Sequence, residues 1–286
     1  ELVRHAGETS LGAIVIEGDG FTRKINCGGS AHLDFEADWK SGQSAANNDL
    51  AGVVFDTELM RYAAGWSGGF VQLRGVAFDG GHGVNPGISG TPIMGTRPLP
   101  GWSTTGSFAD PRPQPLGPLP AAQGKYHGLF RYGDTVVFSY SIAGCQVLDM
   151  PGIEVWDKTR AITRTLNLSK SDEPLSIAVC DMEGATGKIL TAARAAVLEK
   201  GAEVTAAYAV GTPDGTTWQI DEHDRIVLRL PALDKPTQIK VLVWNGLQSD
   251  LTESVALLGR SPQPLDLTAL TKGGPPRWPH SRSAAR

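Results

Sequence analysis

The sequence is poor in cysteine. Its three cysteines, Cys27, Cys145 and Cys180, permit one internal disulfide at most, and none belongs to a C-x-x-C or C-x-x-C-H motif. A cysteine zinc knuckle and covalent attachment of a c-type haem are therefore excluded in this chain. Cys145 and Cys180 lie in strand-like segments, where we expect two small buried side chains. A disulfide between them stays open if the compartment is oxidising.

Long apolar runs and clustered basic residues are also missing. No run of about 18 consecutive apolar residues occurs, so we expect no membrane span. The net charge is -4, and the 26 basic residues are scattered along the chain. Nucleic-acid binding needs a concentrated basic surface, so we expect no nucleic-acid partner. The 286 residues can bury a large core, in one all-β domain or two smaller ones.

Helical periodicity is scarce, and short alternating segments dominate. The 35 glycines and 19 prolines place turn signals between these segments at short intervals. This pattern favours antiparallel sheets over βαβ units, and we predict an all-β fold, a large antiparallel β-sandwich. The expected strands lie in segments 11–20, 68–80, 133–144, 161–169, 175–181, 202–211, 225–232 and 237–246.

A few short helices are expected locally. Segments 57–62 and 250–259 have helical composition. Segment 189–201 fits either a helix stopped by Gly201 or two strands joined by a turn.

The segment TRPLPGWSTTGSFADPRPQPLGPLPAAQG, residues 96–124, departs from the strand pattern. It carries seven prolines, so it cannot be a paired central strand. Trp102 and Phe108 favour a polyproline-like strap docked on the body of the domain. An arm that recognises a partner is the alternative. We expect residues 1–266 to form one β-sandwich domain and residues 267–286, basic and rich in proline, to form a linker or tail.

His82, in the glycine-rich segment DGGHGVNPG, is the first candidate metal ligand. Together with Asp79, and with His127 if the fold brings it across the sheet, it would form a zinc or copper site. A turn histidine bonded to backbone carbonyls is the simpler alternative. Alternating polar residues in segment 32–36 would place oxygens on one strand face, which suits either calcium or a solvated surface.

Aromatic and polar residues near this turn could bind a small molecule. An aromatic face offers apolar contact to a sugar ring, although tryptophans buried in a sandwich would give the same pattern. The candidate ligand-binding residues are Arg61, Trp66, Asn85 and Trp102.

A catalytic site is not selected by any motif. Glycoside hydrolysis would need two carboxylates on opposite sides of a sugar, and Asp56, Glu58 and Asp79 are available without a spacing that selects them. The sequence contains no nucleophile elbow, P-loop, H-E-x-x-H motif or EF-hand loop. Whether the protein is an enzyme stays open.

Several long strings occur in the same order in one family of bacterial secreted proteins. They include VVFDTELMRYAAGWSGGFVQLRGVAFDGGHGVNPG, PGWSTTGSFADPRPQPLGPLP, YHGLFRYGDTVVFSYSIAGCQVLDMPG and LTKGGPPRWP. Over residues 50–278 the chain resembles the N-terminal domain of unknown function of large multidomain proteins that continue into a β-propeller and a c-type cytochrome or other haem-binding domain. The resemblance implies a secreted or periplasmic location, and the start of the chain at Glu1 fits a processed protein or an arbitrary boundary.

Two functions of different class follow. The first, suggested by the resemblance, is a non-catalytic scaffold that docks a c-type cytochrome or β-propeller partner through the strap and tail. The second is a carbohydrate-binding or carbohydrate-cleaving module with a cleft around residues 56–85. No cofactor is certain: a bound calcium, zinc or copper ion stays open, and no covalent haem is expected in this chain.

Overall fold

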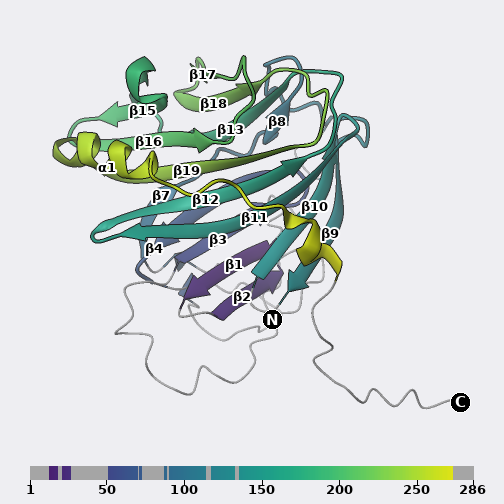
Figure 1. Cartoon of the computed structure of the whole chain (residues 1–286), viewed down its shortest axis with the longest axis horizontal. Helices are drawn as coiled ribbons and strands as arrows, with labels where there is room; N and C mark the ends of the chain where they lie inside the picture. The colour runs from purple at the N-terminus through teal and green to yellow at the C-terminus, as the bar shows by residue number, and fades with distance from the viewer. Residues whose placement is uncertain are drawn as a thin grey trace, which may run out of the picture.

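The structure is a computed structural model that describes residues 13–18, 21–26, 51–69, 71–72, 87–88, 90–113, 117–132 and 135–272. This part of the chain is built almost entirely of antiparallel strands, with one α-helix, α1 (Leu251–Leu258) (Figure 1). The predicted all-β fold is confirmed. No helix among the described residues is long and apolar enough to cross a membrane.

The largest sheet has eight strands and forms one layer of the fold. Its order is β14-β15-β16-β19-β12-β11-β10-β9. The strands are β9 (Gly124–Tyr132), β10 (Thr135–Ile142), β11 (Cys145–Trp156), β12 (Thr159–Leu168), β14 (Thr186–Leu190), β15 (Ala195–Lys200), β16 (Glu203–Val210) and β19 (Thr237–Leu247).

Two smaller sheets adjoin each other and pack on one face of the large sheet. Asp181 donates its backbone N–H to the carbonyl of Gly95, and Ala178 to that of Gly101, so the chain between the two sheets is bonded to both. The five-stranded sheet contains β1 (Ala13–Gly18), β2 (Phe21–Asn26), β3 (Ala51–Asp56), β4 (Arg61–Ser67) and β7 (Thr91–Met94). The four-stranded sheet contains β8 (Trp102–Ser103), β13 (Leu175–Asp181), β17 (Thr217–Ile220) and β18 (Arg225–Leu230). A separate pair is formed by β5 (Val71–Gln72) and β6 (Gly87–Ile88).

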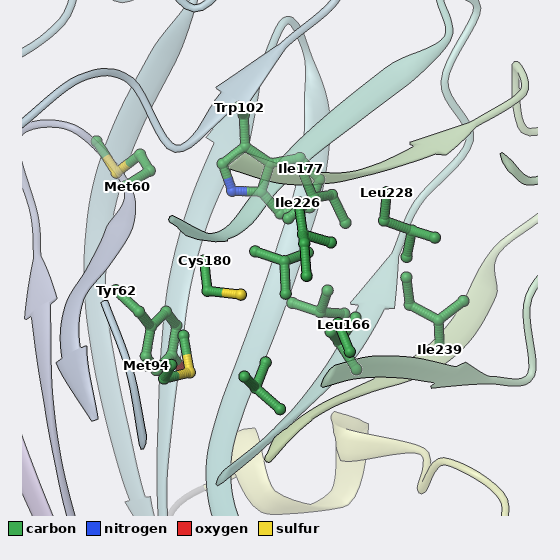
Figure 2. Packing of buried hydrophobic residues seen from close by; sticks show 14 of the residues in the cluster. Met60, Tyr62, Met94, Trp102, Leu166, Ile177, Cys180, Ile226, Leu228 and Ile239 are labelled. Carbon is green, nitrogen blue, oxygen red and sulfur yellow. The ribbon is translucent and has the colours of Figure 1, made fainter. Parts of the chain in front are cut away.

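The main hydrophobic core lies between the layers. Figure 2 shows its centre, where Tyr62 of β4, Trp102 of β8 and Leu166 of β12 converge. Side chains alternate along a strand, and β19 shows the consequence: Val241 and Val243 enter the main core, whereas Leu242 and Trp244 enter a second core that α1 covers on the other face. Both faces of β19 are buried, and its sequence is accordingly apolar without interruption from Val241 to Trp244.

Most expected strands are present, and two local predictions are resolved. Segment 189–201 forms the strand pair, with a short 3-10 turn between β14 and β15. The helix predicted for residues 57–62 is wrong. There the Asp56 carboxylate accepts the backbone N–H groups of Glu58 and Leu59, and Met60 adopts a left-handed φ of 51°, so the chain turns into β4. The helix expected near 250–259 is α1.

The proline-rich strap contributes Trp102 and Ser103, as β8, to the edge of the four-stranded sheet, and its Phe108 is docked on the outer face of that sheet. Phe108 packs on Ala178 and Val227, and Leu119 is also buried. The residues that begin the expected tail are ordered too: Leu267–Lys272 form a 3-10 helix, η5, with Leu267 fully buried beside β9 and β10. Residues 273–286 lie outside the described part of the chain.

Replacing Gly52 by alanine should destabilise the protein by about 1–3 kcal/mol, the usual cost of overpacking a core. The new Cβ would lie 2.3 Å from Cζ2 of Trp66, whose side chain is fully buried. Urea denaturation measures the loss. Gly259→Ala is the matched control, because its Cβ would meet no atom closer than 3.5 Å and its φ is -66°. Equal losses in the two variants would show that the indole is not the cause.

Candidate functional site

Trp66 lies at the end of β4 and serves the fold. Its side chain is fully buried against Gly52, and its indole N–H donates to the carbonyl of Gly69 at 3.1 Å. Gly90 is also close, since a Cβ there would lie 2.9 Å from the indole ring. The tryptophan is therefore held by its own chain, and its role in ligand binding stays a prediction.

The strap passes close to the backbone of Arg61 at Gly101, the residue before Trp102. Gly101 makes this possible, because a Cβ at this position would lie 2.2 Å from the carbonyl oxygen of Met60 and 2.8 Å from Cα of Arg61. Arg61 and Trp102 are only 4% and 5% exposed. A ligand in solvent does not reach side chains at this depth without displacing the strap.

The predicted metal ligands are only partly described. His127 is exposed on β9, where a ring nitrogen lies 3.0 Å from Oγ of Ser141. Asp79, His82 and Asn85 lie outside the described residues, as does segment 32–36, so the predicted metal site stays a prediction. Within the described ranges, no group of three or more histidine, cysteine or acidic side chains is arranged to hold a metal ion.

An ion pair between Asp56 and Arg61 fixes the start of β4. The Nε of Arg61 lies 3.2 Å from Oδ2 of Asp56, and the same guanidinium donates to the carbonyl of Thr96 in the strap. Burial is the main influence on both groups: it raises the pKa of Asp56 and lowers the pKa of Arg61. Asp56 is thus committed to the turn and to Arg61, which leaves it no free oxygen face for acid-base work.

Arg112 forms a second tie between the strap and the turn after β3. Its guanidinium lies 2.7 Å from Oδ2 of Asp110 and 3.6 Å from Oε2 of Glu58. Hydrogen bonds from Arg112 lower the pKa of Asp110. The Arg112 side chain is 3% exposed, so this contact is shielded from screening by solvent more than an ordinary surface pair. Glu58, like Asp56, is therefore used to hold the strap.

The centre of the fold contains a charged group that the sequence did not single out. Asp149 of β11 is fully buried and pairs with Arg164 of β12, whose Nη2 lies 2.8 Å from Oδ2. Tyr140 donates to Oδ2 at 2.8 Å and Tyr62 donates to Oδ1 at 2.9 Å. The Arg164 guanidinium also lies 4.3 Å from the centroid of the Tyr62 ring. Asp149 opposes Leu166 in the register, and Arg164 lies two residues from Leu166, so both charged side chains project from the same face of the sheet. The register is not visible in the sequence, so sequence reasoning missed this pair.

Burial and the neighbouring carboxylate control protonation in this cluster. Burial first, and then the charge of Asp149, raise the pKa values of Tyr62 and Tyr140 well above that of free tyrosine. Burial has the opposite effect on Arg164 and would lower the pKa of its guanidinium, but the Asp149 carboxylate holds that pKa above the ordinary value. One anion, one cation and two neutral phenols therefore occupy the interior together.

Asp149→Asn should destabilise the protein by about 3–5 kcal/mol, because it leaves the buried charge of Arg164 without a counter-ion. Tyr62→Phe removes one hydrogen bond to a charged group and should cost about 1.5–3 kcal/mol. Urea denaturation compares both with Glu222→Gln, a control at a side chain that is 88% exposed. A loss for Asp149→Asn no larger than that of the control would contradict a central role for the ion pair.

The two buried tyrosines also predict a loss of stability in alkali. Their raised pKa values mean that the unfolded chain releases phenol protons above about pH 10 while the folded protein keeps them. The stabilisation is complete below pH 10, and the free energy of unfolding should then fall by about 1.4 kcal/mol per pH unit for each tyrosine. Urea titrations between pH 8 and 11 test this, and Tyr62→Phe/Tyr140→Phe should flatten the slope. An unchanged slope in that variant would contradict the assignment.

The buried charged groups in the described part of the chain form ion pairs. Its strongly buried acids, Asp56 and Asp149, each have a bonded arginine. Cys145 and Cys180 are free and buried, and burial raises the pKa of both thiols, which suppresses the reactive thiolate. The chemistry of these groups suits positioning of the strap.

Comparison with known proteins gives one family match. A family described as a domain of unknown function (DUF6797) matches residues 53–149, about a third of the chain, from β3 to β11. The matched range includes the strap, Asp149 and the three arginines that hold the strap, Arg61, Arg97 and Arg112. A search of curated proteins finds no match.

Proposed function

We propose that the protein is a non-catalytic docking module of a secreted or periplasmic electron-transfer assembly, and that the strap is its contact surface. The observation that carries the proposal is the way the strap is held. Three large side chains, Trp102, Phe108 and Leu119, anchor it, while residues 105–107, Pro111 and Pro113 between these anchors are exposed. A loop held in one conformation loses little entropy on binding, which favours its use for recognition.

The composition of the strap supports the docking proposal. Ser103 accepts the backbone N–H groups of Thr105 and Gly106 through its hydroxyl, and the Asp110 carboxylate accepts the N–H of Arg112. These local bonds satisfy backbone donors without a sheet partner, so the strap can remain exposed and still be ordered. Pro111, Pro113 and Pro118 lie near or between these bonds, and fixed φ angles further reduce the freedom that binding would cost.

The partner class comes from the family resemblance. Relatives of this kind continue into a β-propeller and a c-type cytochrome domain, so we propose a haem protein or its propeller as the docked partner. The engagement of Asp56, Glu58 and Asp149 in structural ion pairs supports a docking role over a hydrolytic one.

Photo-cross-linking in the cells that make the protein tests the proposal. A benzoyl-phenylalanine placed at Thr105 or Ser107, both exposed in the strap, should capture a haem protein that is visible by haem staining. The same reagent at Lys158, which is exposed in the turn between β11 and β12, is the control and should capture much less. Failure to capture a haem protein at either strap position, or equal capture at Lys158, would overturn the proposal.

A further inference from the structure

The start of the strap is held by an aspartate that faces two arginines. Asp181 accepts the backbone N–H and Nε–H of Arg97 on Oδ2, at 2.9 and 2.8 Å. Arg97 also donates to the carbonyl of His223, so it ties the strap both to β13 and to the turn between β17 and β18. Its side chain is 36% exposed, whereas that of Asp181 is 3% exposed.

The second arginine is Arg225 on the neighbouring strand. Asp181 and Arg225 are register partners of β13 and β18. Their neighbours Cys180 and Ile226 both enter the main core, so Asp181 and Arg225 share the opposite face of the sheet. Residues opposed in this way have Cβ atoms about 4.5–5.5 Å apart, close enough for an ion pair.

Each of these two buried side chains keeps polar atoms unused. Among the described residues, Oδ1 of Asp181 has no hydrogen-bond partner, and neither have Nε and Nη2 of Arg225. Arg225 lies 3.2 Å from Oδ2 of Asp221, but the angle is not that of a hydrogen bond. A buried charged group that lacks a hydrogen bond is costly, so a rearrangement that pairs Asp181 with Arg225 would be favoured.

Arg225 is also in contact with an anchor of the strap. Its guanidinium lies 4.7 Å from the centroid of the Phe108 ring, which packs on Ala178 and Val227. A cation over an aromatic ring is attracted to it, so Arg225 helps to hold Phe108 down. Movement of Arg225 toward Asp181 would weaken that attraction.

We propose that Asp181 exchanges Arg97 for Arg225, and that this exchange releases the strap. A carboxylate of a docked protein binds the exposed Arg97 and withdraws it from Asp181. Arg225 then pairs with Asp181 and leaves Phe108, which frees the second anchor. Asp221 tolerates the departure of Arg225 because its side chain is 22% exposed and can be hydrated. The strap is thus a two-state element, and capture of one surface arginine is transmitted to a buried phenylalanine.

The exchange rests on the proposed docking function only for its trigger, and it can be tested without a partner. Arg97→Gln imitates the captured state. With 4-fluorophenylalanine at position 108, the fluorine resonance of this variant should shift from that of the parent protein. Amide exchange in strap residues 103–110 should accelerate by about tenfold, as expected for loss of an ordinary cation–π contact. A crystal structure of the variant should place a guanidinium nitrogen of Arg225 within hydrogen-bond distance of Oδ1 of Asp181.

The double variant Arg97→Gln/Asp181→Asn is the control. It removes Arg97 equally but leaves no charge to attract Arg225, so the fluorine resonance should return to the parent position. An unshifted resonance in folded Arg97→Gln overturns the exchange, and so does an equal shift in the double variant, which would mean that loss of Arg97 alone loosens the strap. Arg97→Met replaces Arg97→Gln if the latter does not fold. Because no haem protein is present, a negative result here leaves the docking proposal standing, and failed cross-linking leaves the exchange standing.

Discussion

The ion pair between Asp149 and Arg164 is the constraint on which the two layers depend. Removing both charges from water is costly, and the cost is offset by their mutual attraction and by further hydrogen bonds. Tyr140 supplies one partner from the same sheet, and Tyr62 supplies another from β4 in the opposite layer. The pair therefore fixes where β4 lies over the large sheet. Apolar contacts alone, which are not directional, would not fix that position.

The same principle recurs at the strap, with smaller energies and more access to solvent. Arg61, Arg97 and Arg112 hold a segment whose pairing with a sheet is brief, at Trp102 and Ser103, because its prolines lack the N–H groups that a longer pairing needs. The side chain of Arg97 is more exposed than those of Arg61 and Arg112. A charged group of another molecule can therefore compete for Arg97 more readily. The docking surface that we propose would combine this rigid segment with one accessible arginine, Arg97.

Some features of the core and of the strap were predicted from the sequence, and others were not. Alternation and turn signals predicted β1, β10, β12, β13, β16, β18 and β19, because a half-buried strand records its surroundings in every second residue. They did not predict β2, β3, β4 or β9. The docked strap was also expected from its prolines and from Phe108. The helix predicted for residues 57–62 failed because Asp56, just before it, bonds the backbone locally. Helical composition carries no information about such a competing turn.

The sequence by itself determined the fold class, the high strand content and the segment that could not be a central strand, since these follow from local periodicity and backbone chemistry. Only the tertiary structure decided the partners of charged residues. Asp149 and Tyr62 are 87 residues apart, and Asp181 lies 84 residues from Arg97. Tertiary structure also placed Trp66 and Trp102 in the interior, away from solvent. Such pairings depend on strand order and register, which are set by the packing of whole sheets and are not written in any local pattern.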